Sequence, residues 1–462
     1  DRVISSDYVG NGVEWDPYDE AEAWGAEVSD ADWAKLSERL DFMRPGYVRC
    51  MINSPYRYYD AATGRYDRMR NLASLRRLLQ YCQDNGITVA YGEYNPPTWA
   101  MKDSQQWVEM SVDYLNFLVC DLGFDCIRHF IIFNEPDGNW ASTDGDYDLW
   151  RSMARRFDAE MARYPDLKRK VSLAAPDVVM SYKNPASEYD TAGWVARSAQ
   201  DLGAQIGIYD VHAYPGQHEV RSGAYAEKLR RIRAEVPAGK KLILGEAGYK
   251  YSAPEDSLLK AEYDRRVAGH PFTKGSDCNM LCYDYFYGLD MPLLAMEVMN
   301  NGLSGVAAWM LDDAMHSNGD SGRTEDVKIW GMWNILGEEV FGDASQEELR
   351  PWYYTWSLMC RHFPAGCDIL ACEVPQREGL RVAAARKDAA YSVAAVNFSQ
   401  EPCTLEIVLP GDFAGGVLYR YTESDRACDA NGFPAPCERG IAGKRFRTTV
   451  PAESFVLLTN VE

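Results

Sequence analysis

One apolar segment that ends abruptly in a carboxylate constrains this chain more than any other feature. Five of the seven residues in 127–133 are apolar, and the segment stops at Asn134, Glu135 and Pro136. So continuous a run is typical of a parallel strand covered on both faces. Pro136 has no N–H to donate to a ladder, so Glu135 is expected where the strand opens into a loop. Reacting groups gather at such strand ends in parallel α/β folds, although a helix-capping glutamate is the alternative.

A second segment repeats this form. In 241–248 a short apolar strand leads to Glu246, and small residues that allow close approach follow it. Glycoside hydrolysis requires two carboxylates beside the scissile bond, one to protonate the leaving oxygen and one to attack or to activate water. Glu135 and Glu246 together therefore predict glycosidase chemistry, which neither residue would predict alone.

With these two positions the chain resembles the glycoside hydrolases of clan A, which are retaining (β/α)8-barrel enzymes. In that clan the acid/base follows an asparagine at the end of strand four, and the nucleophile ends strand seven. The resemblance implies that Glu135 is the general acid/base and Glu246 the nucleophile. It also implies that Asn134 binds the hydroxyl beside the anomeric carbon, and that no cofactor or metal is needed.

Other strand ends supply further candidates. Arg49 lies inside a predicted strand, where a buried arginine needs a carboxylate partner. His212 and Tyr214 are two residues apart and so share one face of another predicted strand. By resemblance to clan A, Arg49 supports the nucleophile, His212 and Tyr214 line the site, and Trp309 is a sugar platform. An ordinary ion pair for Arg49 and a satisfied core position for His212 are the alternatives.

The loop 95–101 contains two prolines that force an extended turn and present Trp99. It resembles the Pro-Pro-x-Trp-Met segment of glycoside hydrolase family 30, with one alanine inserted before Met101. Trp99 either stacks on a sugar or plugs the barrel. We expect the aspartates Asp312 and Asp313 to bind sugar hydroxyls, because too few oxygen ligands are fixed for calcium.

Seven tryptophans lie in or next to the loops that follow predicted strands. A cleft that holds several sugars of a polymer uses more aromatic platforms than a pocket for one terminal sugar. The count therefore favours endo action, unless several of these rings merely close the barrel top. The seven are Trp15, Trp24, Trp99, Trp140, Trp309, Trp330 and Trp333, and Trp140 is placed with Trp99 and Trp309 among the substrate-binding residues.

The order of elements predicts an α/β fold, a (β/α)8 TIM barrel in residues 1–363, followed by a C-terminal antiparallel β-sandwich in 364–462. Apolar periodicity predicts barrel strands at 8–13, 47–51, 87–94, 127–133, 171–175, 208–214, 241–248 and 305–310. Helical spacing predicts helices near 29–43, 72–85, 106–122, 147–164 and 349–363. Beyond residue 363 the pattern alternates, and five short strands are expected. The appendage resembles the C-terminal domain of families 30, 39 and 51.

Composition narrows the partners. The 462 residues carry a formal net charge of −21, which argues against nucleic acid and favours neutral sugars. No run of 18 apolar residues predicts a membrane span. The chain begins at Asp1 without Met, which is expected either of a mature protein that has lost a signal peptide or of a shortened chain. Twelve cysteines form no zinc motif, and a disulfide between Cys428 and Cys437 is considered as an alternative to free thiols. A secreted or periplasmic location is expected, and the oligomeric state is left open.

The sequence thus predicts a retaining hydrolase that cleaves β-glycosidic bonds of a neutral oligo- or polysaccharide, with endo action favoured. An exo-acting β-glycosidase remains an alternative. So does an inverting hydrolase, whose carboxyl groups would stand about 6.5–9.5 Å apart instead of about 5–5.5 Å. The third alternative is a non-catalytic carbohydrate-binding barrel, in which one of the two glutamates would be expected to be replaced.

Overall fold

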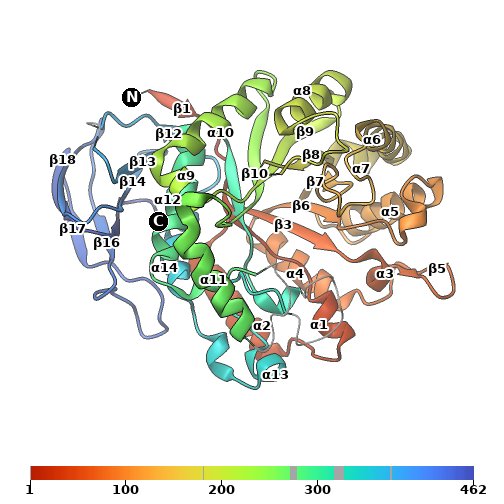
Figure 1. Ribbon diagram of the computed structural model, residues 1–462, viewed down its shortest axis with the longest axis horizontal. Helices are drawn as coiled ribbons and strands as arrows, with labels where there is room; N and C mark the ends of the chain where they lie inside the picture. The colour runs from red at the N-terminus through yellow and green to blue at the C-terminus, as the bar shows by residue number, and fades with distance from the viewer. Residues whose placement is uncertain (1, 181, 271–277, 317–326, 375–376) are drawn as a thin grey trace.

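Eight parallel strands close into a barrel, as the order of elements predicted (Figure 1). The computed structural model describes residues 2–180, 182–270, 278–316, 327–374 and 377–462. Each barrel strand pairs with its neighbour in chain order, and the last pairs with the first. The strands are β2 (Gly10–Glu14), β3 (Tyr47–Ile52), β6 (Thr88–Glu93), β7 (Ile127–Ile131), β8 (Ser172–Val179), β9 (Ile206–Ala213), β10 (Lys241–Ala247) and β11 (Gly305–Ala308).

Side chains from the strands fill the barrel interior as a separate apolar cluster, so the barrel is a packed core and no channel. The members come from seven of the strands: Tyr47, Met51, Ala90, Ile131, Ala174, Ile208, Ile243 and Ala307. The long helices form the outer ring. They are α2 (Asp30–Met43), α4 (Ala73–Asp84), α5 (Gln105–Asn116), α6 (Tyr147–Met161), α8 (Thr191–Leu202), α10 (Ala224–Glu235), α12 (Tyr287–Asn300) and α14 (Pro351–His362).

Further elements lie in the connections between these strands and helices. They are helices α1 (Asp19–Ala23), α3 (Ser54–Arg57), α7 (Pro165–Lys170), α9 (Gln217–Ser222), α11 (Ser257–Gly269) and α13 (Gly337–Phe341), and the hairpin of β4 (Tyr59–Asp60) and β5 (Arg65–Tyr66). A π-helical turn, Phe117–Asp121, extends α5. Helix α11 lies in the long segment between β10 and β11.

Local sequence signals explain where helices begin and end. Ser29 accepts from the backbone N–H of Asp32, and the Asp32 carboxylate accepts from the backbone N–H of Ser29, so α2 starts with a capping box. Gly86 follows α4 with a φ of +65°, a conformation that glycine adopts without strain. Both ends agree with the helices predicted near 29–43 and 72–85.

The C-terminal strands form two antiparallel sheets, which confirms the predicted sandwich class. A seven-stranded sheet has the order β1-β12-β13-β14-β19-β16-β17, and a two-stranded sheet pairs β15 with β18. The strands are β1 (Val3–Ser5), β12 (Asp368–Leu370), β13 (Leu380–Lys387), β14 (Ala390–Asn397), β15 (Cys403–Val408), β16 (Gly416–Tyr421), β17 (Glu438–Ile441), β18 (Arg445–Val450) and β19 (Ser454–Thr459). The sequence did not predict β12, β17 and β18, nor that β1 joins this sheet. The domain division at residue 363 stays a prediction.

The large sheet has two apolar faces. In β19, Leu457 belongs to the core shared with the barrel, whereas Leu458 belongs to the core between the two sheets. Helices α12 and α14 lie between the barrel and these strands (Figure 1). The Tyr421 hydroxyl donates to the carbonyl of Tyr285 at 2.8 Å, and the two rings stack. The C-terminal domain is therefore packed onto the barrel through a continuous apolar contact.

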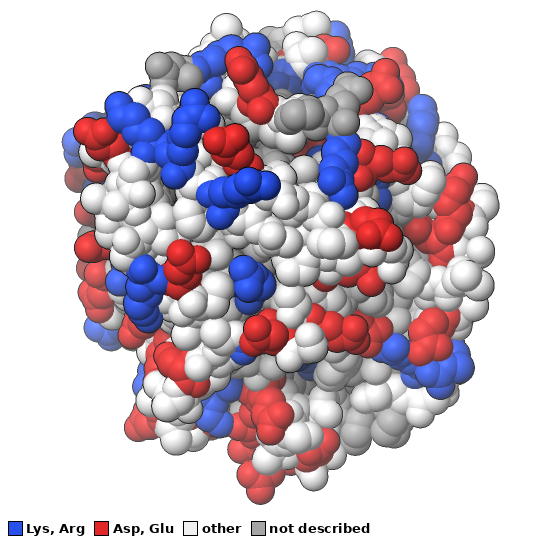
Figure 2. All heavy atoms as spheres, turned by 90° about the vertical axis from the view of Figure 1, so that its left-hand side faces the viewer, with Lys and Arg blue, Asp and Glu red and all other residues white. Residues whose placement is uncertain are grey.

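Figure 2 views the molecule from the side of the C-terminal strands. Basic and acidic side chains are interspersed there among large uncharged areas, so the acidic excess of the chain is not gathered on this face. No helix in the described ranges is long and apolar enough to cross a membrane. The disulfide considered for Cys428 and Cys437 is not formed, because both are free thiols.

Barrel closure generates a stability prediction at Gly12. A Cβ at this position would lie 1.8 Å from the backbone oxygen of Tyr47 on the neighbouring strand. Because backbone must move to relieve this clash, we expect Gly12→Ala to destabilise the fold by about 3 kcal/mol or more. Thermal unfolding measures the effect. Gly269→Ala is the matched control, since a Cβ there meets nothing within 4 Å, and equal unfolding temperatures for both variants would contradict the packing described.

Candidate active site

The two predicted glutamates meet at the carboxyl ends of the barrel strands. Glu135 follows β7 and Glu246 lies near the end of β10. Three atoms lie within 4.8 Å of one another: one carboxylate oxygen of Glu135, one carboxylate oxygen of Glu246 and one ring nitrogen of His212. The side chains are 12% and 7% exposed, so both reach the surface while most of each is enclosed. The fold thus brings together two acids that are 111 residues apart in the chain.

Arg49 lies beneath this pair and joins it to the barrel. Its fully buried guanidinium donates to both oxygens of Glu14, at 2.8 and 2.9 Å, and to Glu246 Oε2 at 3.1 Å. It also donates to Asn134 Oδ1 at 2.7 Å and to Asp177 Oδ2 at 3.0 Å. The carboxylate partner expected for a strand arginine is therefore present three times over, and one of the three is the candidate nucleophile.

His212 connects the two glutamates from the β9 side. Its Nδ1 lies 2.9 Å from Glu135 Oε1 and 3.6 Å from Glu246 Oε2, and its Nε2 lies 3.1 Å from Asp177 Oδ1. Burial alone would lower the pKa of His212, but the charges of Asp177 and Glu246 outweigh it and raise the pKa well above the usual value. The neighbouring carboxylates thus favour the protonated imidazole, which can donate to Glu135 on one side and Asp177 on the other.

Glu246 receives three stabilising contacts. The Tyr214 hydroxyl donates to its Oε1, and Arg49 and His212 approach its Oε2. Burial raises the pKa of Glu246 above its ordinary value, while His212, Arg49 and the Tyr214 hydrogen bond each act to lower it. Arg49 and Tyr214 thus favour the ionised form, as the sequence suggested, but burial outweighs them.

Glu135 is oriented from two directions. Trp140 Nε1 donates to its Oε2 at 2.6 Å, while His212 holds its Oε1. Its backbone has a φ of +50°, a left-handed conformation that is uncommon for glutamate. Asn134 precedes it, and since Arg49 occupies Asn134 Oδ1, the amide group can present its NH2 to a ligand. Of the candidates, Trp140 is 42% exposed and touches Glu135 directly.

The other aromatic candidates lie in different surroundings. Trp99 is 54% exposed and belongs to a 3-10 turn, Trp99–Met101, after β6. Trp309, directly after β11, is 5% exposed and stacks on His316 with ring centroids 5.4 Å apart. His316 in turn lies 2.5 Å from Asp16 Oδ2 and 3.3 Å from Glu20 Oε1. Trp309 is therefore held by a buried ionic cluster.

One sequence-based interpretation is wrong, and for three tryptophans the alternative that they close the barrel top applies. Asp312 and Asp313 are fully buried and cannot bind sugar hydroxyls. Asp312 accepts from Tyr18 and from Trp333 Nε1, each at 3.0 Å, and Asp313 binds the guanidinium of Arg350. Of the seven tryptophans counted for a cleft, Trp15, Trp330 and Trp333 are at most 1% exposed. These three close the barrel top, because loop packing from distant segments covers them.

Four further acids around the site were not predicted to take part. Glu14 and Asp177 bind Arg49, and Asp210 accepts from the Gly245 backbone at 2.8 Å, with a pKa that burial raises to about 7. Burial and the neighbouring Glu135 raise the pKa of Asp137 to about 8. Glu14 ends β2 and Asp177 lies near the end of β8, as Glu246 lies near the end of β10, and that shared position was the available signal.

The described residues contain two groups spaced closely enough to hold a metal ion: Glu135, His212 and Glu246, and Asp177, Asp210 and His212. Both include the His212 imidazole, whose two ring nitrogens lie at hydrogen-bond distance from Glu135 and Asp177. Arg49 binds Glu246 and Asp177 from below. Positive charge is thus supplied to these carboxylates by side chains.

Comparison with solved structures places this architecture among known folds. No protein-family model and no curated protein sequence matches the chain. The structure is similar to a GH30 endoxylanase from Clostridium papyrosolvens C71, with 14% identity, a TM-score of 0.59, and coverage of 100% of this chain and 98% of that one. It is similar to a GH39 β-xylosidase from Caulobacter crescentus, with 12% identity, a TM-score of 0.61, and coverage of 99% and 97%. It is also similar to a glucosidase from Croceicoccus marinus, with 13% identity, a TM-score of 0.64, and coverage of 99% of this chain and 97% of that one.

The chain therefore has the fold of the clan A glycoside hydrolases over its full length, with a barrel and a C-terminal antiparallel domain in the same order. At 12–14% identity the likeness establishes the fold and leaves the chemistry to the residues of this chain.

The cluster behind Trp309 generates a pH prediction. Burial would lower the pKa of His316, but hydrogen bonds to Asp16 and Glu20 raise it to about 10. A pKa raised above the unfolded value of about 6.5 stabilises the fold fully below that pH, and the contribution is lost as pH rises towards 10. Between pH 6.5 and 9.5 we expect the unfolding temperature of the wild type to fall more steeply than that of His316→Gln.

The corresponding free energy is at most about 1.4 kcal/mol per pH unit. His218→Gln, at an exposed position on α9, is the control and should follow the wild type. Parallel profiles for the wild type and His316→Gln would show that His316 does not gain a proton in the folded state.

Proposed function

We propose that this protein is a retaining β-glycoside hydrolase in which Glu246 is the nucleophile and Glu135 the general acid/base. The approach of the two carboxylates to within 4.8 Å, oxygen to oxygen, carries the proposal. Retaining enzymes hold their carboxyl groups about 5–5.5 Å apart, whereas inverting enzymes leave about 6.5–9.5 Å for a water molecule. The retention of both glutamates, each with dedicated partners, also favours catalysis over a binding-only barrel.

The partners of each acid suit these roles. Glu246 attacks the anomeric carbon as the bond to the leaving oxygen breaks, and Glu135 gives its proton to that oxygen. Arg49 and the Tyr214 hydroxyl hold the Glu246 carboxylate in place for attack. In the second step Glu135 takes a proton from water, which attacks the same carbon and releases Glu246. Asn134 binds the hydroxyl beside the anomeric carbon through its amide group.

Azide rescue distinguishes the two roles. Glu246→Ala should lower turnover on the order of 10⁴-fold or more, because no covalent intermediate can form. Azide then enters the space left by the carboxylate and gives a glycosyl azide of inverted configuration. Glu135→Ala still forms the intermediate when the leaving group is good, so azide should give a product of retained configuration. NMR of the two azide products makes the measurement.

Glu160→Ala, which removes a carboxylate on α6 far from the strand ends, is the control and should keep the wild-type rate. Wild-type turnover in Glu246→Ala, or the same azide anomer from both catalytic variants, would contradict the assignment.

The substrate we propose is a neutral β-linked oligo- or polysaccharide, cleaved internally. Trp99 and Trp140 follow neighbouring strands and leave aromatic surface accessible, and Trp140 lies beside Glu135. Trp15, Trp330 and Trp333 are buried, Trp309 is 5% exposed and Trp24 is half-buried, so endo action now rests on the two most exposed of the seven rings, Trp99 and Trp140. A polymeric substrate found outside cells supports the proposal of a secreted or periplasmic location.

Chromatography of early digestion products tests the cleavage mode. On a soluble β-xylan or β-glucan, we expect a spread of oligosaccharides within the first few per cent of hydrolysis, and Trp99→Ala should raise KM for the polymer by roughly tenfold, because a sugar platform is lost. Met69→Ala, at another exposed apolar side chain, is the control. Release of one monosaccharide alone from the first minutes would establish exo action instead.

A further inference from the structure

A second ionic cluster lies beside the catalytic pair, and the proposed mechanism does not use it. Its centre is the imidazole of His316, which stacks on Trp309 and meets the ring of Tyr94 edge to face, with ring centroids 5.3 Å apart. The two imidazole nitrogens lie 2.5 Å from Asp16 Oδ2 and 3.3 Å from Glu20 Oε1. Four of these five side chains are buried, and Tyr94, which is half-buried, is the most exposed member.

The Tyr94 hydroxyl joins this cluster to the carboxylates of the site. It lies 2.6 Å from Asp16 Oδ2, 3.1 Å from Glu14 Oε1 and 3.2 Å from His316 Nε2. A tyrosine hydroxyl carries one hydrogen, so it can donate to only one of the two carboxylates at a time. Asp16 already accepts from a backbone N–H at 2.6 Å, whereas in the described ranges Glu14 has no donor besides this hydroxyl and Arg49. Glu14 is therefore the carboxylate that most needs the hydrogen.

Arg49 makes the position of Glu14 matter for the nucleophile. One guanidinium nitrogen, Nη1, donates to both oxygens of Glu14, at 2.8 and 2.9 Å, and to Glu246 Oε2 at 3.1 Å. The two carboxylates therefore compete for the hydrogens of one nitrogen. Burial raises the pKa of Glu14 well above its ordinary value while the charge of Arg49 acts to lower it, so a further donor to this carboxyl group favours its ionised form. With a second donor in the Tyr94 hydroxyl, Glu14 depends less on Arg49.

We propose that Tyr94 is a positioning residue, whose hydroxyl group holds Glu14 and thereby lets Arg49 orient the nucleophile. The inference rests on the proposed function, because it takes Glu246 to be that nucleophile. The effect passes from the hydroxyl through two side chains to the reacting carboxylate and involves no contact with the sugar. Tyr94 therefore acts on the rate of the chemical step and leaves the affinity for the substrate unchanged.

Kinetics of Tyr94→Phe tests this role, because the variant keeps the ring and loses only the hydroxyl. The substrates are a dinitrophenyl β-xyloside and a dinitrophenyl β-glucoside, whose leaving group departs without a proton from Glu135. We expect kcat and kcat/KM to fall together by about tenfold, as when a contact that acts in the transition state is lost, with KM unchanged. Thermal unfolding of each variant establishes that it is folded.

Tyr58→Phe is the matched control. Tyr58 is a buried tyrosine whose hydroxyl donates to the carboxylate of Glu93, the last residue of β6 and the one directly before Tyr94. Glu93 also accepts from Trp107 Nε1 at 3.0 Å and makes no hydrogen bond to Arg49 in the described ranges. The control should therefore keep the wild-type kcat and KM.

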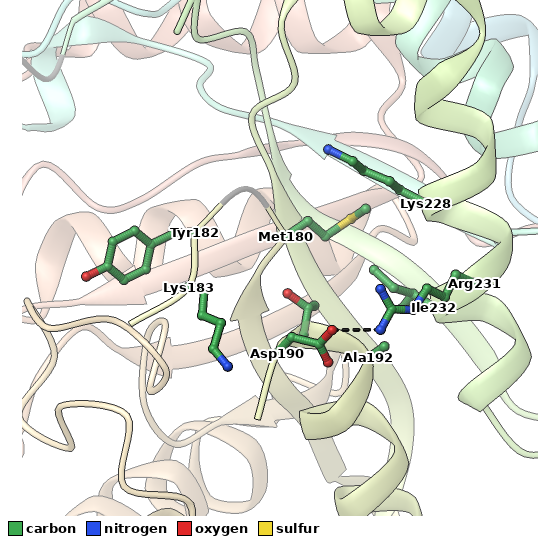
Figure 3. A pocket seen from close by; sticks show the side chains of 9 residues that line it. Met180, Tyr182, Lys183, Asp190, Ala192, Lys228, Arg231 and Ile232 are labelled. Atoms are coloured by element: carbon green, nitrogen blue, oxygen red, sulfur yellow. Dashed lines mark hydrogen bonds and ion pairs between the residues drawn. The ribbon is translucent and has the colours of Figure 1, made fainter. Parts of the chain in front are cut away.

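A double-mutant cycle shows whether the effect passes through Glu14. In a Glu14→Gln background, Tyr94→Phe should cause little additional loss, because the route to Arg49 is already broken. Asp190→Asn is the control background, since it also replaces a carboxylate that pairs with an arginine. That arginine is Arg231, at 2.7 Å, beside a hollow of about 250 Å³ whose described lining residues include none of those around Tyr94 (Figure 3). There Tyr94→Phe should keep its full effect.

Three results would overturn the positioning role while leaving the hydrolase proposal intact. A rise in KM with kcat unchanged would mean that Tyr94 binds the sugar directly. Losses that multiply in the variant with both Glu14→Gln and Tyr94→Phe would mean that the hydroxyl acts by a route that bypasses Glu14. Wild-type kinetics in Tyr94→Phe would mean that the hydroxyl has no role. If the wild type cleaved neither substrate, the proposed function would fail, and the positioning role with it.

Discussion

The site depends on one buried guanidinium. Arg49 points from β3 into the end of the barrel and binds side chains that belong to β2, to β8, to β10 and to the loop after β7. Its side chain is inaccessible to water, so each contact replaces hydration that was lost on folding. Removing one member of such a buried pair typically costs about 3–5 kcal/mol, because the partner is left as an uncompensated charge. A single residue thus couples closure of the barrel to the position of Glu246.

His212 is the second basic side chain that contacts the carboxyl groups of the site. Arg49 serves Glu14, Asp177 and Glu246 from below, and the imidazolium bridges Glu135 and Asp177 from the side. These two basic side chains offset the charge repulsion among the carboxyl groups gathered in this small volume. The left-handed backbone at both Glu135 and Asp177 indicates that the surrounding contacts outweigh local conformational preference. The site is therefore pre-organised around its acids before any substrate arrives.

The sequence predicted the parts of this arrangement that depend on local pattern. Apolar runs that end in Glu135 and Glu246 identified the strands, and an arginine inside a strand implied a carboxylate partner. The sequence could not identify Glu14 as that partner among 69 acidic residues, because the register between barrel strands is set by long-range packing. For the same reason, Asp312 and Asp313 look exposed after a strand, yet Arg350 and Trp333, from segments further along the chain, cover them. Likewise, the pairing of β1 with β12 joins residues more than 360 positions apart and has no local signal.

Double displacement through Glu246 is tested most directly by the stereochemistry of the first product. Proton NMR of the wild-type enzyme acting on a β-glycoside in D2O resolves the anomeric signal of the released sugar before it mutarotates. The structure predicts that the β-anomer appears first and the α-anomer only later. Initial release of the α-anomer would mean that water attacks directly, and would contradict the assignment of Glu246 as a nucleophile.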